Sequence, residues 1–285
     1  MHRLLKGRAG FTLVELMVTM VLTAVIGAAI TGVFVTQARF FDAQEKVAFA
    51  RGVSRGGMNM ILSELRMLET AGGLAEATNR RIMLRAPYAM GIVCGNQLVL
   101  TISRLPVDSV ALRNAGFAGY AYRAPDGTFM YVETTKPVPD QGLSVCLNNS
   151  ITVMSGATVN QQGRVEQFSS VPAPAPAVGA PIFLYQEVVY EFKASASVPG
   201  QIGLWRRVES ADLPADEELV APFDTTAKFR FYVNDSPTAQ TDVPALLSSV
   251  TGIELTLDGL SERPERDGSR QSVPLTTSVF FKNRP

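Results

Sequence analysis

The chain has 285 residues, of which 46% are hydrophobic and 18% are charged, a composition that suits one large or two small globular domains. Three of its 26 basic residues lie in residues 1–10, so residues 11–285 carry 23 basic against 26 acidic side chains and have no basic surplus for nucleic acid. The only histidine is His2, and two cysteines cannot form a four-cysteine zinc site. Once the first residues are removed, catalytic triads and metal sites that need histidine are excluded, and we expect no enzyme, cofactor or metal.

The N-terminal segment combines a basic leader with a long apolar run. Arg3, Lys6 and Arg8 precede a stretch from Leu16 to Val35 that contains no charged residue. As a helix, this stretch would span about 30 Å, the hydrocarbon thickness of a bilayer. The positive flank predicts that the N-terminus stays in the cytoplasm and that the bulk of the chain lies on the other side of the membrane.

A secretory signal peptide is the alternative interpretation of this run, with Gly27-Ala28-Ala29 as its cleavage site. Two features oppose it. Glu15 lies near the start of the apolar segment, where a buried carboxylate costs up to about 2.5–3.5 kcal/mol, and a discarded signal has no reason to bear that cost. Helical patterning also continues beyond Ala29. The sequence therefore favours a helix that the mature protein keeps.

The string GFTLVEL, residues 10–16, closely resembles the class III signal of type IV prepilins and type II secretion pseudopilins. The resemblance implies that a prepilin peptidase cuts between Gly10 and Phe11, removes the leader 1–10 and N-methylates Phe11. It also implies that Glu15 pairs with the terminal amine of a neighbouring subunit during filament assembly. The physical basis is that a charge pair in hydrocarbon is tolerated only when both members find partners.

The helical pattern continues past Val35 and becomes one-sided. Apolar residues recur at spacings of three, four or their sums at Val47, Ala50, Met58, Ile61, Leu65 and Leu68. This pattern predicts a helix over residues 11–72, membrane-spanning at 16–35, with a stop at Gly72-Gly73. Gly52 and Gly56-Gly57 are expected to be weak points at which the helix bends or breaks.

Beyond Gly73 the sequence changes to short β-leaning runs separated by turn-forming stretches. They predict strands at Arg81–Arg85, Gln97–Ser103, Thr128–Glu133, Val145–Met154, Ile182–Phe192, Gly203–Val208, Ala227–Val233, Gly252–Leu257 and Val273–Phe281. The proline-rich segment 171–181 is expected to divide a first β-rich lobe, 75–170, from a second, 182–285. The predicted fold class is α+β, with a long N-terminal helix packed on an antiparallel β-sheet domain, as in pilins.

Three further segments resemble PilW-type minor pilins and GspJ-type minor pseudopilins: Ile61–Leu68, the hairpin 189–207 and the closing strand at Phe281. Typical major pilins are much shorter, so the length indicates a minor subunit. The resemblance implies a single-pass precursor in the bacterial inner membrane with a periplasmic globular domain, which then enters a pilus or pseudopilus. Its implied partners are the prepilin peptidase, an inner-membrane assembly platform and other major and minor subunits, with a role in initiating or capping the filament.

Two other candidate features each have more than one interpretation. Cys94 and Cys146 both fall in the exported part, where an oxidising compartment favours a disulfide, although two buried thiols would also fit. Arg80-Arg81 and Trp205-Arg206-Arg207 could contact DNA or lipid head groups, or could be ordinary solvated strand faces. The alternative functions are therefore an adhesive or DNA-binding module at a filament tip, or a membrane-anchored envelope hydrolase without histidine.

Overall fold

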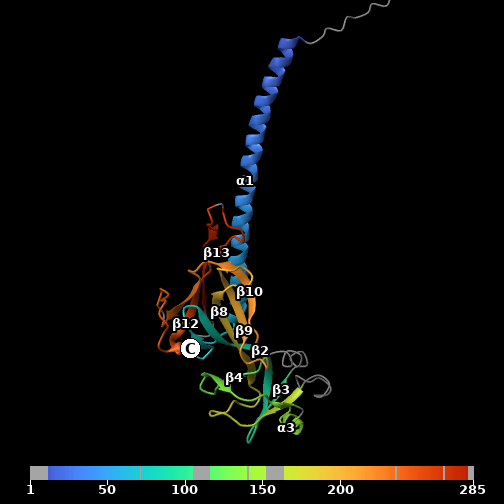
Figure 1. Cartoon of the computed structure of the whole chain (residues 1–285). Coiled ribbons are helices and arrows are strands. Elements are labelled where there is room, and N and C mark those ends of the chain that lie inside the picture. Colours follow the sequence, from blue (N-terminus) through green and yellow to red (C-terminus); the bar gives the residue numbers. More distant parts are fainter. Residues whose placement is uncertain are drawn as a thin grey trace, which may run out of the picture. The chain divides into compact units, whose positions relative to one another are not determined.

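A computed structural model describes residues 12–70, 72–104, 116–139, 141–151, 164–234, 236–265 and 267–281. The chain divides into two compact units, Met1–Ala48 and Phe49–Pro285. The first unit holds the exposed N-terminal part of helix α1. The second holds the remainder of α1 and all the strands (Figure 1).

Helix α1 extends from Leu13 to Leu65 without interruption. The long helix is confirmed, but it ends before the predicted stop at Gly72-Gly73. After Leu65 the backbone tightens, since the Leu68 amide bonds the Leu65 carbonyl at 3.2 Å, three residues back, and the Leu68 side chain enters the core. Gly52 and Gly56-Gly57 do not break the helix.

The described strands of the second unit form two antiparallel sheets, and together with the long helix they confirm the predicted α+β class. The twelve strands of the larger sheet are β1 (Leu74–Ala77), β2 (Arg81–Asn96), β3 (Leu100–Arg104), β4 (Gly119–Arg123), β5 (Phe129–Glu133), β6 (Val138–Pro139), β7 (Arg164–Phe168), β8 (Pro181–Ala194), β9 (Ile202–Val208), β10 (Glu217–Phe223), β13 (Gly259–Leu260) and β14 (Ser272–Val273). Its main path is β14-β13-β10-β9-β8-β2-β3-β7-β6; β1 pairs with β2, and β4 pairs with β5 and β8. The smaller sheet has the order β11 (Lys228–Val233), β12 (Val250–Thr256) and β15 (Thr276–Phe280), with the 3-10 turn η1 (Leu247–Ser249) before β12.

The long strands β2 and β8 form the spine of the larger sheet. Between Pro87 and Ala89 the register shifts, so that Tyr88 is an extra residue in β2. The buried residues that share one face of the pair are Ile82, Leu84, Ala86, Ala89 and Val93 on β2 and Ile182, Leu184, Val188, Tyr190 and Phe192 on β8. Because of this extra residue, the β2 residues on the shared face are even-numbered before the β-bulge and odd-numbered after it. The apolar face of β2 therefore stays beside the apolar face of β8.

Two hydrophobic cores lie along this spine. The first is formed by the end of α1, the first half of β2, the second half of β8 and the smaller sheet. It includes Ile61, Leu65, Leu84, Val188, Phe229 and Ile253. The second lies at the other ends of β2 and β8 and includes Val93, Ile102, Tyr120, Tyr122, Phe168 and Leu184. Both cores thus share the same two strands.

Residues 171–181 do not separate two lobes. The segment bonds the end of β2 instead: the Gly179 amide donates to the Val93 carbonyl at 2.8 Å, and the Asn96 side chain donates to the Pro176 carbonyl at 2.8 Å. Strand β2, from the predicted first lobe, pairs with β8, from the predicted second lobe, over most of its length. Residues 49–285 are therefore one unit.

The predicted strand at Val145–Met154 is wrong where it can be described, because Leu143–Asn148 forms the short helix α3. Its apolar side covers a small core of Cys94, Cys146 and Val165. A short run in which apolar and polar residues alternate fits a helical turn as well as a strand. The contact of α3 with β2 favours the helix here. Strands β1, β4, β6, β7, β10 and β13 lie outside the predicted ranges.

The end of α1 approaches the strands closely through glycines. A Cβ at Gly57 would lie 3.0 Å from Phe223 Cζ, and a Cβ at Gly259 would lie 2.2 Å from the Ala50 carbonyl oxygen. The buried Ser54 hydroxyl accepts a hydrogen bond from the Gly259 amide at 2.9 Å. Gly57 is thus a position of close helix–strand contact rather than a hinge.

Candidate functional site

The N-terminus of α1 is capped by Thr12. The Glu15 amide donates to the Thr12 hydroxyl at 3.2 Å, and the Leu16 amide donates to the Thr12 carbonyl at 3.1 Å. Thr12 directly precedes the first helical residue and Glu15 is three residues later, which is the spacing of a capping box. The carboxylate of Glu15 also lies in the first turn, where the helix dipole favours an anion.

Sequence reasoning did not assign a role to Thr12, although the Thr-x-x-Glu spacing before an apolar run could have revealed it. The predicted cleavage pair Gly10 and Phe11 lies outside the described residues, so only Glu15 of the three predicted motif residues is placed by the structure. It is exposed on the helix surface.

The apolar part of α1 is not buried by the rest of the chain. Every residue from 12 to 42 is exposed, and the side chains include Leu13 at 76% and Phe34 at 67% exposure. The helix is long and apolar enough to cross a membrane. Such a contiguous apolar surface requires a membrane or protein partner.

Polar side chains inside the apolar segment are satisfied within the helix. The hydroxyls of Thr19, Thr23 and Thr31 donate to backbone carbonyls three or four residues earlier, at 2.9, 2.7 and 2.8 Å. Internal bonding removes the cost of placing these hydroxyls in hydrocarbon. Between Leu13 and Val35, Glu15 is the single charged residue.

The two cysteines are brought together by β2 and α3. The structure joins Cys94 and Cys146, which are 52 residues apart in sequence, and both are fully buried. The Asn149 side chain, just after α3, donates to the Cys94 carbonyl at 2.8 Å. This arrangement ties α3 to the end of β2.

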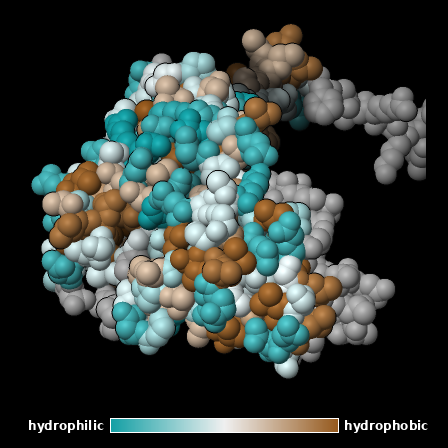
Figure 2. Space-filling model, turned by 90° about the horizontal axis from the view of Figure 1, so that it is seen from below, coloured by the Kyte–Doolittle hydropathy of each residue, from teal (hydrophilic) through white to brown (hydrophobic). Residues whose placement is uncertain are grey.

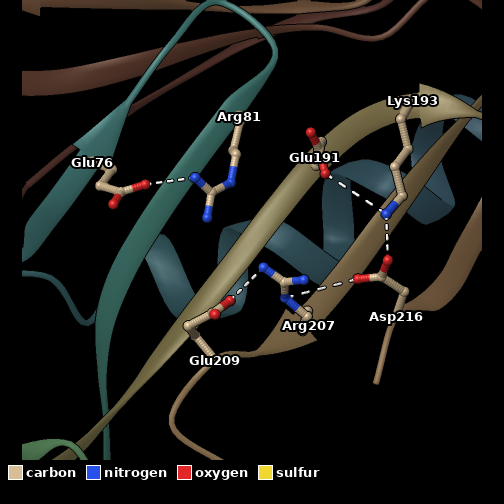
Figure 3. A network of polar contacts seen from close by, with 7 residues as sticks. All are labelled: Glu76, Arg81, Glu191, Lys193, Arg207, Glu209 and Asp216. Atoms are coloured by element: carbon tan, nitrogen blue, oxygen red, sulfur yellow. Dashed lines mark hydrogen bonds and ion pairs between the residues drawn. The ribbon is translucent and has the colours of Figure 1, made fainter. Parts of the chain in front are cut away.

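In each arginine pair predicted as a possible DNA or lipid contact, one arginine (Arg81 or Arg207) faces carboxylates. Arg81 bonds Glu76 at 2.6 Å, and Arg207 pairs with Glu209 at 2.5 Å and with Asp216 at 3.8 Å (Figure 3). Figure 3 shows these side chains spread over neighbouring strands. Their positive charges are compensated locally, which leaves no concentrated basic surface at these residues.

Two carboxyl groups on these strands have shifted pKa values. Lys193, which donates to Asp216 at 2.5 Å, holds the pKa of the Asp216 carboxyl below its ordinary value. Burial raises the pKa of the Glu187 carboxyl, and Arg85, 3.8 Å away, acts in the opposite direction. These shifts follow from local ion pairs and burial.

The other two arginines of these pairs are also engaged. Arg80 donates to the Thr225 carbonyl at 2.9 Å, and Arg206 bonds Glu64 of α1 at 2.9 Å. Arg206 therefore links β9 to the helix. In the part of the chain that the structure describes, no group of three His, Cys, Asp or Glu side chains could hold a metal ion.

Comparison with protein families places one motif on this chain. The model of the prokaryotic N-terminal methylation motif matches residues 5–31, which include the capped helix start and most of the apolar segment. No curated protein and no solved structure matches the chain. This motif overlaps the start of an unburied apolar helix that is followed by an antiparallel β domain, and it supports a type IV prepilin-like protein.

Proposed function

We propose that this protein is a minor type IV pilin or minor pseudopilin that co-assembles into a filament and initiates or caps it. The observation that carries the proposal is the capped, fully exposed apolar segment of α1 with its single charge at Glu15. A neighbouring helix can cover such a surface, and a neighbouring terminal amine can neutralise the carboxylate. The β domain, Phe49–Pro285, would then extend outside the bundle of helices.

The size of the second unit supports a position at the tip of the filament. The second unit comprises residues 49–285, and repeated stacking of such a domain along a shaft would crowd it. In this proposal the precursor is anchored in the inner membrane with the β domain in the periplasm, and the assembly platform and the other subunits are its partners. The compensated arginines give no support to a DNA-binding tip.

The first experiment tests processing. The membrane form should begin at Phe11 and carry one added methyl group, as measured by intact mass and N-terminal sequencing. Gly10→Leu, which places a bulky side chain before the cut, should keep the leader and serve as the control. A mature terminus near residue 30 would refute the proposal, because the apolar helix would then be a discarded signal.

A second experiment tests the position in the filament. Sheared filaments should contain this chain, and quantitative mass spectrometry should give a constant number of copies per filament whatever the filament length. A number that rises in proportion to the major subunit would place the protein in the shaft. Absence from filaments of a strain that processes the chain normally would contradict co-assembly.

A further inference from the structure

Three separate segments of the second unit contain no charged residue. They are residues 86–103, 141–151 and 167–186, although 18% of the whole chain is charged. The centres of protein contact surfaces are depleted of charged residues, because a charge that leaves water must find a partner. Uncharged segments are therefore suited to an apolar contact if the fold brings them together.

The fold does bring these segments to one end of the β domain. The disulfide between Cys94 and Cys146 joins the first segment to the second. The third segment follows the end of β2, where the Asn96 side chain donates to the Pro176 carbonyl at 2.8 Å. In Figure 1 this end carries α3 and the turn between β2 and β3. A covalent bond and a hydrogen bond thus fasten three uncharged segments to one another.

Each segment exposes an apolar side chain. Leu98 in the turn between β2 and β3 is 90% exposed, Leu147 on α3 is 50% exposed and Val178 is 43% exposed. The neighbouring Gln97 and Asn148 are also exposed and are polar without charge. Seen from below, apolar patches interrupt the polar surface of the β domain (Figure 2). These five residues are called the uncharged end below.

The charged residues that border the segments are engaged elsewhere. Arg104 follows the first segment and Glu166 precedes the third; they are 0% and 1% exposed and pair with each other. On the turn from β4 to β5, Arg123 and Asp126 each bond a main-chain group of the same turn at 2.9 Å. The five residues of the uncharged end therefore offer no ionic contact to an acidic or a basic ligand.

An uncharged lipid bilayer has the chemistry that this end can recognise. Its hydrocarbon accepts leucine and valine side chains, and its ester and phosphoryl oxygens accept hydrogen bonds from amide groups such as those of Gln97 and Asn148. Without lysine or arginine, the three segments have no preference for anionic lipids. A leucine that is 90% exposed on a turn protrudes rather than lining a groove, which fits a planar partner.

We propose that the uncharged end of the β domain inserts Leu98 into the surface of an uncharged phospholipid bilayer, with Leu147 and Val178 beside it. The disulfide and the hydrogen bond hold these side chains in place, so the contact costs little ordering entropy. This membrane-docking surface goes beyond the proposed filament role, because it needs no residue of the apolar helix. At a filament tip it would attach the filament to a second membrane.

The probe is a vesicle of phosphatidylcholine. Full-length protein is held by its helix in nanodiscs of the same lipid, so that only the β domain is free to bind added vesicles. Fluorescence correlation with labelled scaffold protein measures the fraction of discs that diffuse with vesicles, and discs without the protein give the background. We expect binding above this background that phosphatidylglycerol in the vesicles does not increase. Binding equal to the background, or binding only to vesicles with the anionic lipid, would overturn the proposal.

The matched variants are Leu98→Gln and Leu213→Gln. Leu213, on the loop between β9 and β10, is 89% exposed and has acidic neighbours, Asp212 and Asp216. Leu98→Gln should weaken vesicle binding by about tenfold or more, because the contact loses the burial of one leucine. Leu213→Gln should leave binding unchanged. Both leucines are exposed, so both variants should fold like the wild type, and equal binding by the two variants would overturn the proposal.

Brominated phosphatidylcholine locates the contact. Trp205 on β9 is the single tryptophan of the chain, so Leu98→Trp adds one reporter at the turn. Vesicles of brominated lipid should quench the added emission of Leu98→Trp and leave the wild type and Leu213→Trp unchanged. Unquenched emission from vesicle-bound Leu98→Trp would overturn the proposal.

The rival occupant of the uncharged end is a second copy of this chain. Discs that pair with one another without vesicles, and that Leu98→Gln separates, would replace lipid binding by self-association. Because the assay needs no filament, a negative result leaves the proposed filament role standing. Failure of filament assembly would in turn leave vesicle binding unaffected.

Discussion

At the scale of single residues, Glu15 has one role that the structure shows and a second role that we propose. Its position three residues after the cap Thr12 places it in the first turn of α1, where the helix dipole favours a negative charge. Its position in an otherwise uncharged segment makes it the natural partner for a terminal amine in hydrocarbon. The first role stabilises the monomer slightly. The proposed second role would act only on assembly.

Glu15→Ala should separate these roles. The variant should insert in the membrane and be processed normally, because a costly charge is removed and Gly10 is untouched. Its recovery in sheared filaments should fall by about tenfold or more, since an unpaired charge in an apolar interior costs about 3–5 kcal/mol. Glu45→Ala, which removes an exposed carboxylate from the same helix, is the control. Normal co-assembly of Glu15→Ala would show that Glu15 is only an interfacial residue.

The glycines of α1 give a second prediction at this scale. Gly57→Val should lower the free energy of unfolding by about 1–3 kcal/mol, because the new side chain meets Phe223 and Leu204. Gly52→Val should be neutral or slightly stabilising, since nothing lies within 4 Å of its Cβ position. Thermal unfolding of the two full-length variants checks this. Equal melting temperatures would contradict the close contact at Gly57.

At the scale of elements, the bond between Cys94 and Cys146 fastens α3 to β2. Replacing both cysteines by alanine should lower the free energy of unfolding by about 2–4 kcal/mol, because the unfolded chain loses a closed loop. Reduced wild-type protein should unfold at the same temperature as the variant. Alkylation without reductant should leave both thiols of periplasmically expressed protein unmodified. Two freely alkylated thiols would exclude the bond.

Strands β3 and β7 are joined by a buried ion pair. Arg104 is 0% and Glu166 1% exposed, and the Arg104 Nε donates to the Glu166 carboxylate at 2.7 Å. Glu166→Gln should lower the free energy of unfolding by about 3–5 kcal/mol, because the buried guanidinium of Arg104 loses its bonds to a charged carboxylate. The double variant Arg104→Met/Glu166→Leu should lose less. Chemical denaturation measures both, and a smaller loss in Glu166→Gln than in the double variant would contradict this account.

At the scale of the whole molecule, the two cores share β2 and β8, so we expect residues 49–285 to unfold in one transition. Phe168→Ala in the second core should lower the midpoint of the unfolding transition that Trp205 fluorescence reports, although Trp205 lies on β9 beside the first core. Phe229→Ala in the first core should act in the same way, and each should cost about 3–5 kcal/mol. If Phe168→Ala left the unfolding midpoint reported by Trp205 fluorescence unchanged, residues 49–285 would contain two lobes that unfold independently.

The sequence by itself determined the N-terminal part of this protein. Charge, apolar length and the spacing of Gly10, Phe11 and Glu15 are local properties, so they can be recognised without knowing what the segment contacts. The long helix and the antiparallel β domain were predictable for the same reason, since each depends on the periodicity of neighbouring residues. The cap Thr12 was readable from the same local pattern.

Only the tertiary structure decided how the β domain is joined. Nothing near residues 171–181 in sequence shows that β2 and β8 pair across them, because that register depends on contacts between distant residues. The bulge at Tyr88 and the helical form of Leu143–Asn148 likewise depend on the faces that partner strands offer.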